Sequence, residues 1–210
     1  MNFELSEEQK MIQQSVERFV QENYDLPKRV EISSKDPGYN KDYWGSMAEL
    51  GWLGLPFNEE DGGFGGNQID TLVIMEQFGK GLVLEPFLAN IVLGGGAIQI
   101  GGSEELKKEI LPSLIEGTKQ ITLAYAEQQS RFDLEDVATS ARLEGNKYII
   151  NGQKSMVLNA ESADHLVVVA RTSGGQVDEK GISLFLVDSN SNGLEKQNFP
   201  TVDGLRASEI

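Results

Sequence analysis

The residue types that most often carry catalysis are scarce in this chain. It contains no cysteine and a single histidine, His165, which excludes thiolate chemistry, disulfides and a histidine-rich zinc site. Two glycine-rich stretches, 62–66 and 94–96, lack the Gly-x-Gly-x-x-Gly spacing that holds a dinucleotide between a strand and a helix. His165 directly precedes an apolar run, which favours a structural or interface role. Residue types and spacing alone therefore reveal no catalytic constellation, and no metal site is expected.

The charge balance limits the classes of partner. The chain carries 33 acidic and 18 basic residues, a net charge of -15, and such a surface repels the phosphate backbone of nucleic acids. The acidic N-terminus has neither the basic region nor the apolar region of a secretory signal. No apolar run reaches ~18 residues, the length of a membrane-spanning helix. We therefore expect a cytoplasmic protein with no nucleic-acid or membrane partner.

The hydrophobic pattern changes character near residue 120, from helical spacing to alternating or short continuous runs. Ser6 and Gln9 form a capping box before an apolar stripe, so a first helix is expected to start there. Gly51 and Gly117 are stop signals, and Ser103 is a start signal. The further helices are expected over residues 41–50, 69–78, 86–100 and 103–117.

Beyond this change the sequence predicts strands. The Asn-Gly pair at 151–152, between Tyr148 and Lys154, indicates a hairpin turn. Strands are expected over residues 121–125, 137–143, 148–154 with its turn, 166–170 and 181–187. The fold class is therefore expected to be an α+β multidomain chain. An all-α helical domain would cover 1–118, and an incomplete antiparallel β-barrel or sandwich middle domain would cover 119–210.

Six short motifs follow one another in the order and at the spacing of a known family. No single motif is decisive, but their order and spacing argue against a chance match. They are Leu-Ser-Glu-Glu-Gln (5–9), Glu-Leu-Gly-Trp-Leu-Gly-Leu-Pro (49–56), Asp-Gly-Gly (61–63), Leu-Pro-Ser-Leu-Ile-Glu-Gly (111–117), Tyr-Ile-Ile-Asn-Gly-Gln-Lys (148–154) and Asn-Ala-Glu-Ser-Ala-Asp (159–164). In this arrangement the chain resembles the acyl-CoA dehydrogenases.

The resemblance implies a cofactor, a reaction and partners. Members of that family bind FAD in the β domain and hold an acyl-CoA thioester between the flavin and C-terminal helices. A glutamate from those helices removes the α-proton, a hydride passes from the β-carbon to flavin N5, and an electron-transfer flavoprotein takes the electrons. Residues 205–210 read as the start of a strand, so the chain is expected to be a fragment. The C-terminal helical bundle and the catalytic base are expected to be absent from it.

The glycines at 94–96 interrupt an expected helix, where each one costs about 1 kcal/mol. Such small residues indicate that something packs very close to the backbone. A bound acyl chain is one interpretation, and a neighbouring helix is the other. The neighbouring helix is favoured.

The segments that would bind flavin depart from the family pattern. Ala126 stands where the family has a threonine, and Phe132 stands where it has a serine. Met156 replaces a tryptophan, and Leu158 replaces a threonine or serine that donates to flavin N5. Each lost side-chain hydrogen bond is worth about 1 kcal/mol net. The cofactor-binding residues implied by the resemblance are Leu123, Tyr125, Ala126, Phe132, Met156, Val157 and Leu158. The implied substrate-binding residues are Ser130, Arg131 and Phe132.

The altered segment 126–134, with 136–139 after it, is similar to the small subunit of pimeloyl-CoA dehydrogenase-type enzymes. Those enzymes pair a small subunit with a large one, so a large acyl-CoA dehydrogenase subunit is an expected partner, with a homo-oligomer as the alternative. Arg131 would then be placed to bind a carboxylate or phosphate of the substrate through its fork of donors. An ion pair with Asp133 or Glu135 is an equally weighted alternative.

Three functions remain open at this stage. The leading one is an FAD-dependent acyl-CoA dehydrogenase subunit that is inactive by itself. A second is a non-catalytic scaffold subunit that keeps the fold, binds no flavin and completes its partner's site, and the substitutions at Ala126, Phe132, Met156 and Leu158 motivate it. The third and lowest-ranked is an acyl-CoA oxidase or a flavin monooxygenase on the same fold.

Overall fold

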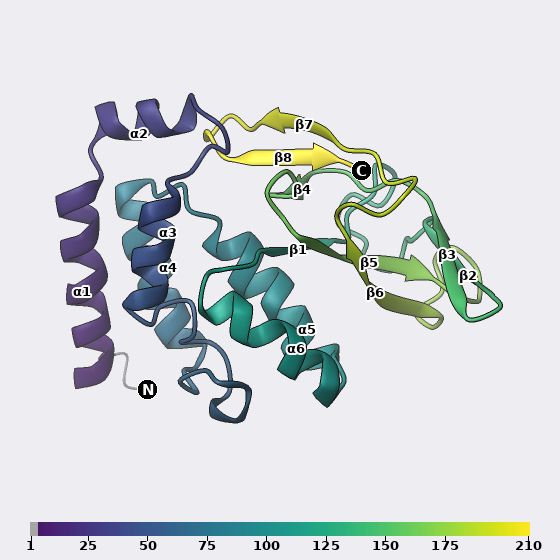
Figure 1. Cartoon of the computed structure of the whole chain (residues 1–210), viewed down its shortest axis with the longest axis horizontal. Coiled ribbons are helices and arrows are strands. Elements are labelled where there is room, and N and C mark those ends of the chain that lie inside the picture. The colour runs from purple at the N-terminus through teal and green to yellow at the C-terminus, as the bar shows by residue number, and fades with distance from the viewer. Residues whose placement is uncertain (1–3) are drawn as a thin grey trace.

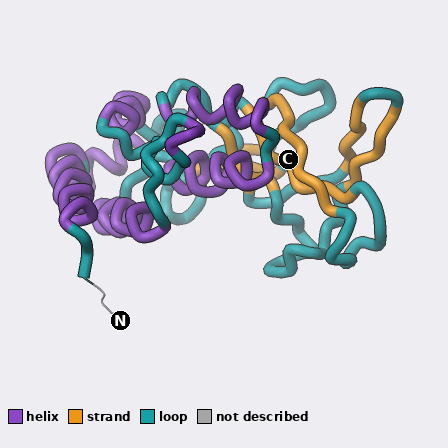
Figure 2. The backbone as a smooth tube through the Cα atoms, turned by 90° about the horizontal axis from the view of Figure 1, so that it is seen from below, coloured by secondary structure: helices purple, strands orange, loops and turns teal. Residues whose placement is uncertain are grey.

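The computed structural model describes residues 4–210, and Met1–Phe3, part of the acidic N-terminus considered above, lie outside the described residues. Helices form one end of the molecule and strands the other (Figures 1 and 2). The helical end consists of α1 (Glu7–Asn23), α2 (Leu26–Ser33), α3 (Lys41–Glu49), the 3-10 turn η1 (Glu59–Asp61), α4 (Gln68–Gly81), the π-helix η2 (Leu88–Gly95), α5 (Gly96–Gly101) and α6 (Glu104–Ile115). A helical domain followed by a β domain confirms the expected fold class.

The helix starts follow the capping signals in the sequence. The Ser6 hydroxyl accepts a hydrogen bond from the Gln9 amide at 3.1 Å, and the Gln9 side-chain oxygen accepts one from the Ser6 amide at 3.0 Å. Ser103 caps α6 in the same way, accepting from the Leu106 amide at 3.3 Å. Helix α2 is not among the helices expected from the sequence. Pro27 occupies the first turn of α2, where its missing N–H costs nothing.

The core of the helical end is apolar and rich in aromatic rings. Its largest fully buried side chains include Met47, Phe57, Ile74, Phe87 and Leu111. Edge-to-face ring contacts join several elements, for example Phe19 with Trp52 at 5.3 Å and Phe78 with Phe87 at 5.5 Å between ring centroids. This packing fixes η2, the element on which β1 packs.

The glycines at 94–96 do not pack against a helix, so the favoured interpretation is wrong in that detail. A Cβ on Gly94 would lie 2.8 Å from the Ile121 carbonyl oxygen of a strand, and a Cβ on Gly95 would lie 2.5 Å from the Phe57 ring. Gly96 has no such neighbour. The close neighbours are therefore a strand of the β end and a loop aromatic. The backbone of this segment is a π-helix, a rare geometry that places an extra residue in each turn.

The β end contains two sheets built from β1 (Ile121–Ala124), β2 (Ser140–Glu144), β3 (Lys147–Asn151), β4 (Val157–Leu158), β5 (His165–Arg171), β6 (Ile182–Asp188), β7 (Gln197–Pro200) and β8 (Arg206–Glu209). Strand β5 is central and buried, pairing in parallel with β1 and antiparallel with β6. The second sheet has the order β4-β8-β7. The pairing is thus mixed, because β1 enters from the helical end and runs alongside β5 rather than returning against it.

The predicted Asn151-Gly152 hairpin turn is wrong. The turn lies at Gly145 and Asn146, between β2 and β3, and Gly145 adopts φ +61° there. After Asn151 the chain leaves the sheet and passes close to Thr139, where a Cβ on Gly152 would lie 2.6 Å from the Thr139 Cα. The glycine at 152 therefore serves a close approach of two backbones, not a turn.

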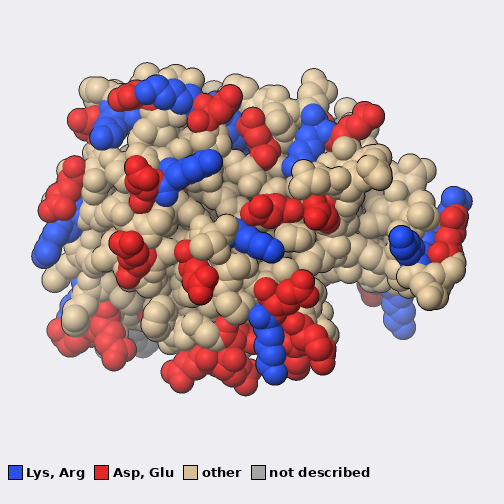
Figure 3. Space-filling view, viewed as in Figure 1, with Lys and Arg blue, Asp and Glu red and all other residues tan. Residues whose placement is uncertain are grey.

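The surface carries the excess of acidic residues seen in the sequence. Figure 3 shows acidic side chains gathered along the lower edge of the helical end, with basic side chains scattered between them. Among the helices of residues 4–210, none is long and apolar enough to cross a membrane.

Candidate functional site

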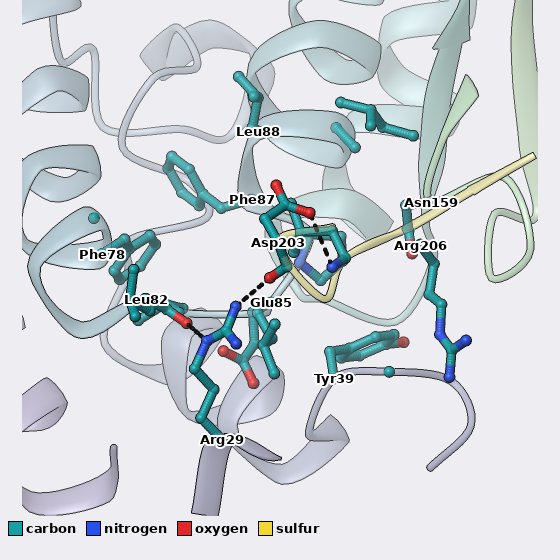
Figure 4. A pocket seen from close by; sticks show the side chains of 18 of the residues that line it. Arg29, Tyr39, Phe78, Leu82, Glu85, Phe87, Leu88, Asn159, Asp203 and Arg206 are labelled. Carbon is teal, nitrogen blue, oxygen red and sulfur yellow. Dashed lines mark hydrogen bonds between the residues drawn. The ribbon is translucent and has the colours of Figure 1, made fainter. Parts of the chain in front are cut away.

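A cleft of about 260 Å³ lies between the helical end and the β end. Its wall on the helical side comes from the end of α4, the turn after it and the start of η2. Its wall on the β side comes from the end of β4 and from the turn and strand that close the second sheet (Figure 4). Most of the lining is apolar, including Phe78, Leu82, Phe87, Leu88 and Leu158. The cleft can therefore hold an apolar group against residues of both ends.

The segment Met156–Asn159, of which Leu158 and Asn159 line the cleft, has an unusual conformation. Met156 and Asn159 adopt positive φ angles of +54° and +56°, which cost free energy for residues other than glycine. Hydrogen bonds hold the segment in place: the Thr122 hydroxyl donates to the Leu158 carbonyl at 2.6 Å, and the Asn159 amide donates to the Arg206 carbonyl at 2.8 Å. Leu158 is thereby fixed as part of the cleft lining.

A buried polar chain ties this segment to the helical end. Asn159 donates from Nδ2 to the Gln120 side-chain oxygen at 2.7 Å, and Gln120 donates from Nε2 to the Tyr39 hydroxyl at 2.7 Å. The Gln120 amide also donates to Asp164 at 2.8 Å. Because Gln120 and Asn159 are buried, these bonds are shielded from water and position the two walls relative to each other.

Two arginines close one side of the cleft. Arg29, on α2, donates from Nε to the Leu82 carbonyl at 2.7 Å and from Nη2 to the Asp203 carbonyl, as Figure 4 shows. Arg206 reaches from β8 to the chain after α2, where it donates to the Ser33 carbonyl at 3.4 Å. Both guanidinium groups bind backbone carbonyls, so they join the β7–β8 turn to the helical end.

Glu85 is a buried carboxylic acid on the cleft wall. Burial is the largest influence on this group and raises its pKa, although hydrogen bonds from Tyr24 and Asn40 oppose the rise. The Tyr24 hydroxyl donates to one carboxyl oxygen, and the Asn40 amide donates to the other at 3.1 Å. Both oxygens are thus occupied by structural donors that link α1, the chain before α3 and the start of η2.

The predicted cofactor-binding residues are divided between surface and core. Tyr125, Phe132 and Met156 are exposed, at 43%, 100% and 51%. Val157 is buried in the β core, and Leu123 packs against the helical core. The loops that carry these residues lie side by side, since the Ser155 amide donates to the Ala126 carbonyl at 2.9 Å.

The predicted substrate-binding residues differ in exposure. Ser130 is buried, and its hydroxyl accepts from the Glu127 amide and donates to the Glu127 carbonyl, which closes the turn. Arg131 is exposed with φ +48°. Across the part of the chain that the structure describes, Arg131 forms no ion pair, and Asp133 instead accepts from the Glu135 amide at 3.0 Å. The alternative of a local ion pair is therefore not observed.

The sequence analysis missed a buried ion pair beside these loops. Lys154 Nζ lies 2.6 Å from Glu127 Oε1, and each side chain is 3% exposed. Burial alone would raise the pKa of Glu127, but donors led by Lys154 and Gln129 lower it to about 2. Burial lowers the pKa of Lys154, and Glu127 opposes that shift. Nothing in the local spacing of the sequence signals this pair, because Lys154 lies 27 residues after Glu127.

The geometry suits a flavin ring in one respect and not in another. Tyr125, Phe132 and Met156 are exposed, and an aromatic ring system could cover side chains of this kind. Ala126 and Leu158 offer no side-chain hydroxyl, so polar contacts with the ring edge would have to come from backbone groups. Within residues 4–210 no group of three or more metal-binding side chains lies together.

The fold and the cleft define the class of this molecule: a helical bundle joined to a mixed β domain, with an apolar cleft shared between them. The family model for the acyl-CoA dehydrogenase N-terminal domain matches residues 6–118, and that for the acyl-CoA dehydrogenase middle domain matches residues 122–210. The chain belongs to the acyl-CoA dehydrogenase family.

Named relatives and solved structures agree with this assignment. A probable acyl-CoA dehydrogenase, YngJ of Bacillus subtilis, is 31% identical over 92% of this chain and 51% of its own length. The FAD complex of PigA has a TM-score of 0.87 at 27% identity, covering 100% of this chain and 56% of that one. A structure described as the electron transferring flavoprotein of Acidaminococcus fermentans has a TM-score of 0.86 at 27% identity, covering 100% and 56%. The chain spans about half the length of the curated relatives it matches.

Proposed function

We propose that the chain is a subunit of an FAD-dependent acyl-CoA dehydrogenase, which oxidises the Cα–Cβ bond of an acyl-CoA thioester. The observation that carries the proposal is the shared cleft. Leu158, from a predicted cofactor segment, lines it together with Phe87 and Leu88 of the helical end. An apolar acyl group in this cleft would lie against Leu158, two residues after Met156.

In this proposal the chain's own residues bind and orient the acyl group. The apolar walls exclude water, and the Gln120 hydrogen bonds hold the two walls at a fixed separation. Flavin, when bound, supplies the acceptor for the hydride that leaves the β-carbon. Glu85 has both oxygens engaged by Tyr24 and Asn40, so it is not placed to take the α-proton. The family resemblance implies that a glutamate of the C-terminal helices takes that proton.

The partners are part of the proposal. The resemblance of segment 126–134 to a pimeloyl-CoA dehydrogenase-type small subunit supports pairing with a large subunit. The likeness to the Acidaminococcus fermentans structure supports an electron-transfer flavoprotein as electron acceptor. The division into domains 1–118 and 119–210, and a cytoplasmic location, belong to the same proposal.

The test is to produce the full-length protein together with the large subunit encoded beside it. The purified complex is expected to be yellow, with flavin absorbance in stoichiometric amount, and to reduce an artificial electron acceptor when acyl-CoA is added. A colourless complex that lacks this activity would contradict the proposal.

A second candidate is a scaffold subunit that binds no flavin. The absence of side-chain hydroxyls at Ala126 and Leu158 favours it, because the Thr122 hydroxyl nearby is already bonded to the Leu158 carbonyl. The variants Ala126→Thr and Leu158→Thr distinguish the two. A flavin site would retain or tighten FAD binding in these variants, whereas a scaffold would remain empty in all of them.

A further inference from the structure

The ion pair between Glu127 and Lys154 is among the most enclosed polar features of the β end. The two charged atoms lie 2.6 Å apart, and both side chains are 3% exposed. Removing two such charges from water is costly, and an apolar pair of similar volume is often as stable or more stable. Fold stability alone is therefore a weak reason for the pair, and its contacts give a better one.

The Glu127 carboxylate gathers donors from several places in the chain. It accepts from the Ala138 amide at 2.9 Å, the Thr139 amide at 3.1 Å and Gln129 Nε2 at 2.8 Å, in addition to Lys154. The carboxylate thus fixes the loop after β1 against the segment that leads into β2. Charge-assisted bonds of this kind are shorter and stronger than bonds between neutral groups.

Lys154 connects the loop after β1 to two further segments, its own segment and the chain end at Ile210. Its Nζ also donates to the Tyr125 carbonyl at 3.2 Å. Its backbone exchanges two hydrogen bonds with Ile210, at 2.7 and 2.8 Å. The next residue, Ser155, binds the Ala126 carbonyl through its amide and Glu209 through its hydroxyl at 2.8 Å.

The position of these bonds along the chain is the decisive point. Glu127 directly follows Tyr125 and Ala126, and Lys154 precedes Met156 by two residues, so each partner stands at the base of one predicted cofactor loop. The side chains of Tyr125 and Met156 are themselves exposed, at 43% and 51%. The buried pair, together with the hydrogen bond from the Ser155 amide to the Ala126 carbonyl, joins the two loops at their base.

We infer that Glu127 and Lys154 are positioning residues that hold the loops 125–132 and 154–158 at the spacing needed to receive the flavin ring. This inference rests on the proposed function for its ligand, but the restraint on the two loops is a property of the chain itself. It can therefore be measured with and without FAD.

The experiment uses the full-length protein with Glu127→Gln, Lys154→Met and the double variant. FAD affinity is measured by quenching of flavin fluorescence, stability by urea unfolding, and loop mobility by amide hydrogen exchange without flavin. Glu127→Gln leaves the buried Lys154 ammonium without its counter-charge, and Lys154→Met leaves the buried Glu127 carboxylate without its own. In both single variants, stability and FAD affinity are therefore expected to fall. The double variant removes the unbalanced charge and is expected to recover stability.

FAD affinity in the double variant decides whether Glu127 and Lys154 position the loops or only stabilise the fold. Because the Tyr125 carbonyl has still lost its donor, the Kd is expected to remain about tenfold weaker than in the unsubstituted protein, the effect of one charge-assisted hydrogen bond. Amides in 125–132 and 154–158 are expected to exchange faster. If Kd and exchange return to their original values together with stability, the pair is merely structural and the inference is overturned.

Two controls separate the outcomes. Leu111→Ala creates a cavity in the core of the helical end and should lower stability without changing loop exchange. Glu31→Gln breaks an exposed ion pair with Lys35 and should change neither the stability nor the hydrogen exchange of the loops. If the unsubstituted protein binds no FAD, the flavin part of the proposed function fails, and hydrogen exchange in the loops still decides whether the pair positions them.

Discussion

At the scale of single residues, Glu127 gives the β end a defined response to acid. Its pKa is lowered to about 2 in the folded chain, from an ordinary value of 4.5, despite its burial. A carboxyl group with a depressed folded pKa contributes stability that is present above the unfolded pKa and lost as pH falls toward the folded one. The free energy of unfolding is therefore expected to decline between about pH 4.5 and pH 2.

This decline can be assigned to Glu127 by substitution. Urea unfolding midpoints measured across that pH range are expected to fall in the unsubstituted protein. In the double variant Glu127→Gln/Lys154→Met they should fall less steeply, because position 127 no longer titrates. Parallel curves for the two proteins would show that other carboxyl groups carry the acid response.

A second prediction at residue scale concerns Tyr39. Replacing it with phenylalanine removes the acceptor of the Gln120 Nε2 hydrogen bond and leaves a buried donor unsatisfied. Such a loss is expected to reduce the free energy of unfolding by about 1–3 kcal/mol, measured by urea denaturation. Tyr43→Phe serves as the control, since its hydroxyl makes a longer bond to the Asn23 carbonyl at 3.3 Å in a partly exposed place. An equal loss in both variants would contradict the special role of the Gln120 link.

At the scale of elements, the packing of η2 on β1 gives two nearby glycines different tolerance to substitution by alanine. Gly94→Ala would force a methyl group to within 2.8 Å of the Ile121 carbonyl oxygen, and such overpacking typically costs about 1–3 kcal/mol. Gly96→Ala meets no atom within 4 Å and should be neutral or stabilising by about 0.5–1 kcal/mol, since alanine favours helix. Thermal unfolding of the two variants checks the contrast, and a stable Gly94→Ala variant would refute the packing argument.

The same elements show what local sequence can and cannot predict. Caps at Ser6 and Ser103 were predictable, because a capping signal acts within three residues. The π-helix was not, since its cause is the approach of Ile121, some 27 residues after Gly94. The turn at Gly145 was misplaced because an Asn-Gly pair nearby carried a stronger local signal.

In the candidate site, too, local features could be predicted from the sequence and contacts between distant residues could not. Its segments were located by resemblance, and one of them contributes Leu158 to the cleft between the two halves of the chain. The partner of Glu127 and the bonds of Gln120 were not predicted, because they join residues that are distant in sequence and carry no periodic signal. Whether the predicted residues bind flavin and substrate stays a prediction.

At the scale of the whole molecule, the cleft exists only because both ends contribute to it. The Gln120 chain and the two arginines hold the ends together through buried or backbone-directed bonds. A ligand in the cleft would touch both ends and therefore stabilise their junction, since anything that binds only the folded state raises its stability. Acyl-CoA is accordingly expected to raise the unfolding temperature in proportion to the logarithm of its concentration.

Filling the cleft tests that expectation. Leu88 lines it and is 40% exposed, so Leu88→Trp should narrow the cleft while leaving the fold intact. The rise in unfolding temperature caused by acyl-CoA should then shrink, with binding weaker by about tenfold or more. The matched control is Leu72→Trp on α4, a position that is 60% exposed and does not line the cleft. If Leu72→Trp weakens binding as much as Leu88→Trp does, the acyl group lies elsewhere and the shared cleft is not its site.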